Sequence, residues 1–134
     1  MTQEDKELLL KDLCARLPYG VICYDEAQKE NGFFKTFEYE GFGRIHNGRG
    51  LRFIENIKPY LFPLSSMTES QNDSWRDTWF PDLMISTDVN YPESEKYLVS
   101  SHVKSLQWLY ENHFDINGLI DKGLALDATD KNIY

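Results

Sequence analysis

Two prolines four residues apart, Pro59 and Pro63, constrain the fold of this chain more than any other feature of its sequence. Proline has no backbone N–H and a fixed φ, and it holds the preceding residue extended. Neither a helix nor an inner strand is therefore expected to continue through this segment. We expect residues 57–64 to form an extended apolar strap across an open end of a sheet, with Tyr60, Leu61 and Leu64 inserted against Leu13, Leu17 and Leu106.

The chain is long and apolar enough to form one hydrophobic core. It has 134 residues, a hydrophobic fraction of 41% and 8 Phe, 8 Tyr and 3 Trp, which is typical of a single folded domain over 1–134. Its first residues are polar and acidic, unlike a signal peptide, and no apolar run approaches the roughly 20 residues that span a bilayer. These features predict a soluble cytoplasmic protein with no membrane partner. Cys14 and Cys23 are interpreted as small buried apolar residues.

An excess of acidic residues argues against general nucleic-acid binding. The net charge is −8, whereas binding to phosphates needs clustered Lys and Arg. Segment 33–64 is the exception, because its five basic and three acidic residues give it a charge of +2. Basic and aromatic residues alternate there as in small barrels that bind nucleic acid, although a solvated face is the preferred interpretation. The candidate contacts are Lys35, Arg44, Arg49 and Arg52, with Phe42 and Phe53 between them.

Caps and apolar spacing predict two helices. Thr2 and Asp5 form an N-cap pair before apolar residues at helical spacing, so one helix is expected over 3–16. The second is expected over 101–113, followed by a compact tail. Residues 65–99 are expected to be irregular, because the capping box of Ser66 and Glu69 is followed by no apolar face. A short strand is a candidate at 83–85.

Turn signals and β-forming residues predict an antiparallel meander over 21–57. Asn31-Gly32 and Asn47-Gly48 are typical hairpin turns, and no βαβ spacing is present. We expect an α+β fold, with a small antiparallel meander or an SH3-like partly closed barrel flanked by an N-terminal and a C-terminal helix. The four expected strands cover 21–24, 33–39, 42–46 and 51–57.

No catalytic, cofactor or metal motif is complete. Glycines in 43–50 are spaced as in a phosphate-binding loop, but Arg49 and Gly50 stand where that motif has Lys and Ser or Thr. Segment 115–126 lacks the correctly placed glycine and final glutamate of a calcium loop. His46 is isolated, and His102 and His113 would lie about 16 Å apart along one helix. We expect no enzyme activity, no cofactor and no metal.

Four aromatic residues are candidates for contact with a protein partner: Tyr60, Trp75, Trp79 and Phe80. Large aromatic side chains are enriched at binding hot spots. Burial in the protein's own core is the simpler interpretation of the set and is preferred.

Three blocks of sequence resemble small uncharacterised proteins encoded by prophages and mobile elements of gut Bacteroides-type bacteria. The blocks are KDLCARLPYGV (11–21), IKPYL with Pro63 and SSMT (57–68), and FD, GLI and GLAL (114–126). Phe62 is a departure, because the group carries Arg there, and residues 24–50 and 70–100 do not carry the resemblance. The resemblance implies a cytoplasmic, mobile-element context and supplies no catalytic residues.

Together these observations predict a non-enzymatic accessory protein that acts through protein–protein contacts, self-association included. A nucleic-acid-associated small barrel ranks second as a hypothesis, and an unrecognised enzyme ranks third.

Overall fold

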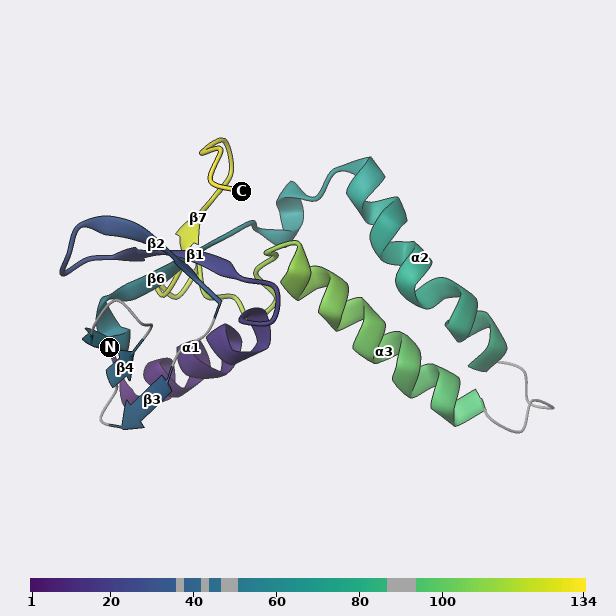
Figure 1. Ribbon diagram of the computed structural model, residues 1–134. Coiled ribbons are helices and arrows are strands. Elements are labelled where there is room, and N and C mark those ends of the chain that lie inside the picture. The colour runs from purple at the N-terminus through teal and green to yellow at the C-terminus, as the bar shows by residue number, and fades with distance from the viewer. Residues whose placement is uncertain (36–37, 42–43, 47–50, 87–93) are drawn as a thin grey trace.

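The protein is an α+β structure in which a small body carries a long helical hairpin (Figure 1). The computed structural model describes residues 1–35, 38–41, 44–46, 51–86 and 94–134. These described residues form three α-helices, a four-stranded mixed sheet and a separate three-stranded sheet. Both sheets are open, which confirms the predicted α+β class without closure into a barrel.

Helix α1 (Gln3–Arg16) covers the body and has the predicted bounds. Its N-cap is Thr2, whose hydroxyl accepts a hydrogen bond from the Asp5 N–H at 3.0 Å, while the Asp5 carboxylate accepts one from the Thr2 N–H. Such a reciprocal cap satisfies two donors that a helix start would otherwise leave unpaired. Leu9 and Leu13 are buried, but Cys14 is exposed because it lies about 100° around the helix from Leu13. The prediction of a buried Cys14 is therefore wrong, and that of a buried Cys23 is confirmed.

Strands β1 (Val21–Asp25) and β2 (Glu30–Phe34) form the first hairpin, although not at the predicted turn. Asn31 and Gly32 lie within β2, opposite Tyr24 and Cys23. The turn falls earlier, at 26–29. There the Asp25 carboxylate accepts hydrogen bonds from the N–H groups of Ala27 and Gln28. An acidic side chain that bonds its own backbone in this way stabilises a turn as effectively as an Asn-Gly pair.

The segment predicted as a strap is an inner strand, β6 (Ile57–Leu61). It pairs antiparallel with β1 and parallel with β7 (Leu126–Asp127), giving the order β2-β1-β6-β7. Leu61 is buried in one cluster with Leu13, as predicted, and Tyr60 is buried too. Leu64 remains 47% exposed, contrary to prediction, because after Pro63 the chain turns into a short 3-10 helix, η2 (Leu64–Ser66).

Pro59 fits in an inner strand because of the direction in which its nitrogen faces. The Leu61 carbonyl accepts a hydrogen bond from Ala128 beside β7, and alternate residues of a strand present their backbone groups to the same side. Pro59 therefore faces β7, whose pairing with β6 begins only at Tyr60. No ladder bond is missing as a result.

On the opposite side of β6, a tyrosine hydroxyl stands between the strands. The register Cys23↔Pro59 would next pair Ile22 with Tyr60. Instead, the Ile22 N–H donates to the Tyr134 hydroxyl at 3.0 Å, and that hydroxyl donates to the Tyr60 carbonyl at 2.8 Å. The side chain of Tyr134 thus bridges β1 and β6 where their direct pairing ends.

Strands β3 (Glu38–Gly41), β4 (Arg44–His46) and β5 (Leu51–Phe53) form a second antiparallel sheet. Residues 21–57 are thus divided between two sheets rather than forming one four-stranded meander. The predicted turn at Asn47-Gly48 lies outside the described residues, as does Phe42. A 3-10 turn, η1 (Ile54–Asn56), connects β5 to β6, and its Ile54 is buried.

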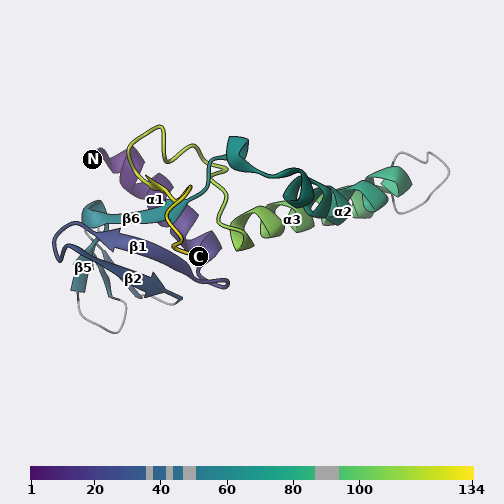
Figure 2. The same cartoon turned by 90° about the horizontal axis from the view of Figure 1, so that it is seen from above.

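Helices α2 (Glu69–Ser86) and α3 (Ser94–Glu111) pack against each other and extend away from the body (Figures 1 and 2). The prediction that 65–99 is irregular is wrong, as is the candidate strand at 83–85. Helix α2 is capped by Thr68 and Gln71, two residues beyond the predicted pair, and continues through Pro81. Helix α3 begins seven residues before the predicted start of 101.

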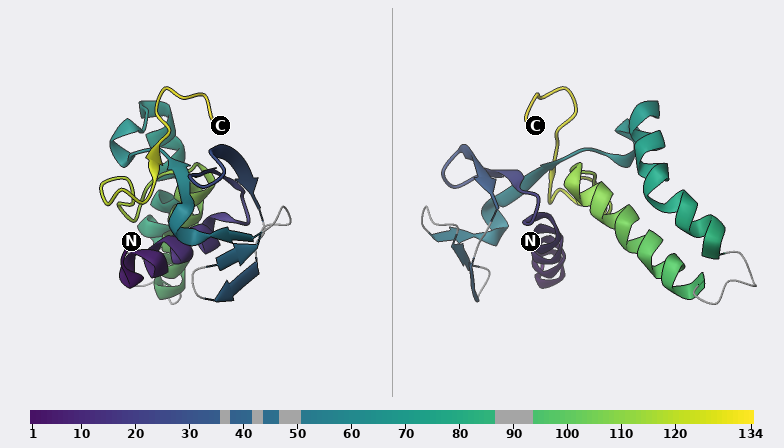
Figure 3. Two further views of the ribbon diagram at one scale, coloured as in Figure 1. Left: turned by 90° about the vertical axis from the view of Figure 1, so that its left-hand side faces the viewer. Right: turned by 45° about the vertical axis from the view of Figure 1, so that its right-hand side comes forward.

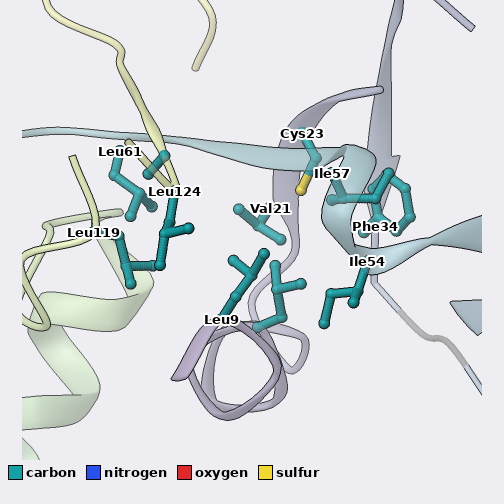
Figure 4. Close-up of a cluster of buried hydrophobic side chains, with 11 residues drawn as sticks. Leu9, Val21, Cys23, Phe34, Ile54, Ile57, Leu61, Leu119 and Leu124 are labelled. Carbon is teal, nitrogen blue, oxygen red and sulfur yellow. The ribbon is translucent and has the colours of Figure 1, made fainter. Parts of the chain in front are cut away.

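The core lies between α1, the mixed sheet and the tail 119–125, and is shown in Figure 4. A buried ion pair borders it. The Arg16 guanidinium donates to both carboxylate oxygens of Asp12, at 2.7 and 3.1 Å, and to the Phe114 carbonyl at 2.7 Å. Asn117 donates to the same Asp12 carboxylate at 2.9 Å, so the network joins α1 to the chain that follows α3.

Candidate protein-interaction surface on the helical hairpin

One face of the α2–α3 hairpin carries an apolar groove. Two hollows compose it, one of about 570 Å³ towards the tip and one of about 560 Å³ towards the body. Trp75 lines both hollows, so the two adjoin at this residue. Its apolar lining, which we call the hairpin groove, consists of Leu64, Met67, Trp75, Trp79, Val99 and Leu109.

Three aromatic residues of α2 form a packed row beside this groove. The rings of Trp75 and Trp79 are 5.5 Å apart in an edge-to-face arrangement, and those of Trp79 and Phe80 are 6.0 Å apart. The Trp75 indole N–H donates to the Ser105 hydroxyl of α3 at 3.0 Å. Spacing of one helical turn between the two tryptophans is what places both indoles against α3. The row thus holds the two helices together while leaving ring surface in the groove.

Several apolar side chains of the hairpin are open to solvent, and one of them, Val99, lines the groove. Val99 is 64% exposed, Val103 45% and Phe80 37%. Exposed apolar residues that are scattered need no explanation, but a contiguous set around a hollow marks an interaction site. These residues belong to α2 and α3, which extend away from the body (Figure 1).

The opposite face of the hairpin is polar. A smaller hollow there, of about 330 Å³, is lined by Asp77, Thr78, Lys104, Gln107, Trp108 and Glu111. Asp77 lies about 180° around α2 from the midpoint of Trp75 and Trp79, as expected from 100° per residue. The hairpin therefore carries a mainly apolar groove on one face and, on the other, a hollow lined by two acidic residues and one lysine.

The structure separates the four aromatic residues that sequence reasoning grouped as protein contacts. Trp75, Trp79 and Phe80 lie together on α2, but Tyr60 lies in β6, where its hydroxyl donates to the Asn31 side chain at 3.0 Å. Tyr60 is buried and belongs to the core.

The basic residues considered for nucleic-acid contact lie in or near the second sheet. Backbone register pairs Arg44 with Phe53 and Arg52 with Ile45, so the two arginines are not cross-strand neighbours of each other. Lys35 follows β2 and is exposed, and Arg49 lies outside the described residues. These positions form no single row on the described backbone.

Sequence reasoning missed the residues that complete the groove. Val99 and His102 belong to a helical turn of α3 that spans the end of the predicted irregular segment, and Leu64 was expected in the core. Val99 and Val103 are four residues apart, which is helical spacing. This spacing is the signal in the sequence that favours extending the helix back to residue 94.

Burial shifts the pKa values of two titratable groups in and near the core. Burial, followed by the nearby Arg16 guanidinium, lowers the pKa of His113 to about 4, so its imidazole is neutral at pH 7. Burial raises the pKa of the Cys23 thiol far above its usual range. Among the side chains that the structure describes, no group of three or more His, Cys, Asp or Glu could hold a metal ion.

Within the described part of the chain, no helix has both the length and the apolar character needed to cross a bilayer. Comparison with protein-family models, with curated proteins and with solved structures gave no match.

Proposed function

We propose that this chain is a non-enzymatic, cytoplasmic accessory protein of a mobile element that acts by binding protein through the hairpin groove. The observation that supports this most strongly is the placement of the groove on helices that extend from the body. A groove lined by Trp75, Trp79 and Val99 offers apolar area to an amphipathic helix, and it needs no rearrangement of the core to be reached.

The three blocks that resemble mobile-element proteins supply the context of the proposal. In the fold they meet at the body: Arg16 from the first block donates to the Phe114 carbonyl from the third. Leu61, from the second, packs in one cluster with Leu13 and Leu119. The hairpin lies almost entirely outside these blocks, so the resemblance concerns the body that carries it.

Affinity capture with substituted baits tests the proposal. Wild-type protein, Val99→Asp and Gln107→Asp are used as baits in cells that carry the element, and bound proteins are identified by mass spectrometry. Each substitution places one carboxylate on an exposed position of α3, on the apolar or on the polar face. We expect a specific protein, another copy of the chain included, to be retained by wild type and Gln107→Asp and lost with Val99→Asp. Equal capture by all three baits would contradict the proposal.

A further inference from the structure

We infer that the hairpin groove is occupied by the hairpin of a second copy of this chain, forming a four-helix arrangement with twofold symmetry. The inference rests on the proposed function and names the partner. In a twofold contact the same surface meets itself, so it must offer both a hollow and something to fill it. The apolar face does so, because Val99, which is 64% exposed, lines a hollow of about 570 Å³.

The area of the hairpin face formed by α2 and α3 suits a modest dimer interface. Each hairpin helix has 18 residues. At about 1.5 Å per residue and about 10 Å per helix width, two such helices present about 540 Å². Two copies would then bury about 1,100 Å² in total, just above the roughly 1,000 Å² expected of a specific interface. An interface of this size is expected to be reversible rather than permanent.

Charge determines which helices face each other. Helix α2 carries four acidic residues and one arginine, a charge of −3, whereas α3 has two lysines and two glutamates and is neutral with its histidine uncharged. Placing α2 against α2 of the second copy would oppose two helices of charge −3. Placing α2 against α3 opposes the acidic helix to a helix without net charge and so avoids that repulsion. A twofold axis parallel to the hairpins produces this pairing.

Hydrodynamics tests the self-association. Sedimentation equilibrium of the full chain, from about 1 μM to about 1 mM, covers the affinities expected of a reversible dimer. We expect wild type and Gln107→Asp to dimerise, and Val99→Asp to weaken the dimer at least about tenfold, with unchanged circular dichroism. A wild-type chain that stays monomeric throughout, or a Val99→Asp variant that dimerises equally well, would overturn the inference.

Cross-linking tests the pairing of the helices. Arg76→Cys on α2 and His102→Cys on α3, each combined with Cys14→Ser, are exposed positions at similar heights along the hairpin. A mixture of the two proteins should form intermolecular disulfides faster than either protein alone. Faster coupling of Arg76→Cys with itself would overturn the pairing of α2 with α3.

The two proposals fail differently. If the chain is monomeric but another protein is captured and lost with Val99→Asp, the second copy is the wrong occupant and the proposed function stands. If neither a copy nor another protein depends on Val99, both fail.

Discussion

The body and the hairpin of this protein differ in how far the side chains of their helices are buried. In the body, α1 packs on one core with the mixed sheet and the tail 119–125, and its Leu9, Leu13, Asp12 and Arg16 are all buried. In the hairpin, no described side chain of α2 is buried, and among the described side chains of α3 only Ser101 and Leu109 are. Figure 3 shows the two helices standing clear of the sheets.

This difference separates two roles. The body gains its stability from apolar area removed from water and from the buried ion pair of Arg16 with Asp12. The hairpin leaves apolar area unused, which costs stability and provides binding capacity. Another protein surface packed against the hairpin groove would bury its apolar side chains, as those of α1 are already buried.

The largest expected effect separates two arginines. Arg16→Ala should destabilise the protein by about 3–5 kcal/mol, because it leaves the buried Asp12 carboxylate without its charge partner. Arg76→Ala, on the exposed face of α2, should change the free energy of unfolding by less than about 1 kcal/mol, although the Arg76 guanidinium lies 4.8 Å from the Phe80 ring. Urea unfolding measures both. Equal losses of unfolding free energy for Arg16→Ala and Arg76→Ala would contradict the difference in burial between the body and the hairpin.

A second comparison uses apolar truncation. Leu61→Ala should cost about 2–5 kcal/mol, since the side chain is fully buried in the cluster of Figure 4. Val103→Ala on α3 should cost less than about 0.5 kcal/mol of monomer stability, because its side chain is largely exposed. Thermal unfolding at low protein concentration gives both values. A loss under about 0.5 kcal/mol for Leu61→Ala would contradict its place in the core.

Removal of one hydroxyl should produce an intermediate effect. Tyr134→Phe deletes the bridge between the Ile22 N–H and the Tyr60 carbonyl, and should cost about 1–2 kcal/mol. Tyr19→Phe is the matched control, because no hydrogen bond of its hydroxyl is found among the described residues. Amide exchange at Ile22 is the direct measurement, and it should accelerate only in Tyr134→Phe. Unchanged exchange would show that the bridge does not protect the strand.

The smallest effect concerns pH and the junction between hairpin and body. His113 takes up a proton near pH 6.5 when unfolded but only near about 4 when folded. The unfolded chain therefore binds more protons between these values, and stability falls as pH decreases through that window. Because the side chain is partly exposed, we expect its contribution to be about 1–2 kcal/mol.

His113→Gln should remove this part of the pH dependence, as measured by urea unfolding at about pH 7 and about pH 4.5. His102→Gln, on the exposed face of α3, is the control for the hairpin. A pH slope unchanged by His113→Gln would contradict the lowered pKa of His113.

Local signals predicted the body better than the hairpin. Helix α1 follows from its cap and its apolar spacing, both of which are short-range. Helix α2 could not be predicted in this way, because Pro81 and a polar first half weaken its pattern, and its packing against α3 supplies the missing stabilisation. The burial of Arg16 also escapes prediction, since it depends on a carbonyl 98 residues away.

The candidate site was recognised only in part for the same reason. Trp75, Trp79 and Phe80 stand out by residue type, but Val99 and Leu109 become their neighbours only when the chain doubles back. Residues 57–64 were wrongly predicted to form a strap. The sequence shows that Pro59 lacks an N–H, but it does not show to which side of the strand the proline nitrogen points.

Pro59 has a consequence for how the sheet assembles. If β6 slipped by one residue against β1, Pro59 would present its nitrogen to β1 and forfeit a ladder bond, while Leu61 would turn out of the core. Wrong registers are thus penalised twice, once in hydrogen bonding and once in burial. A strand that forms only after a long intervening segment can align in several registers during folding, and Pro59 disfavours those shifted by one residue.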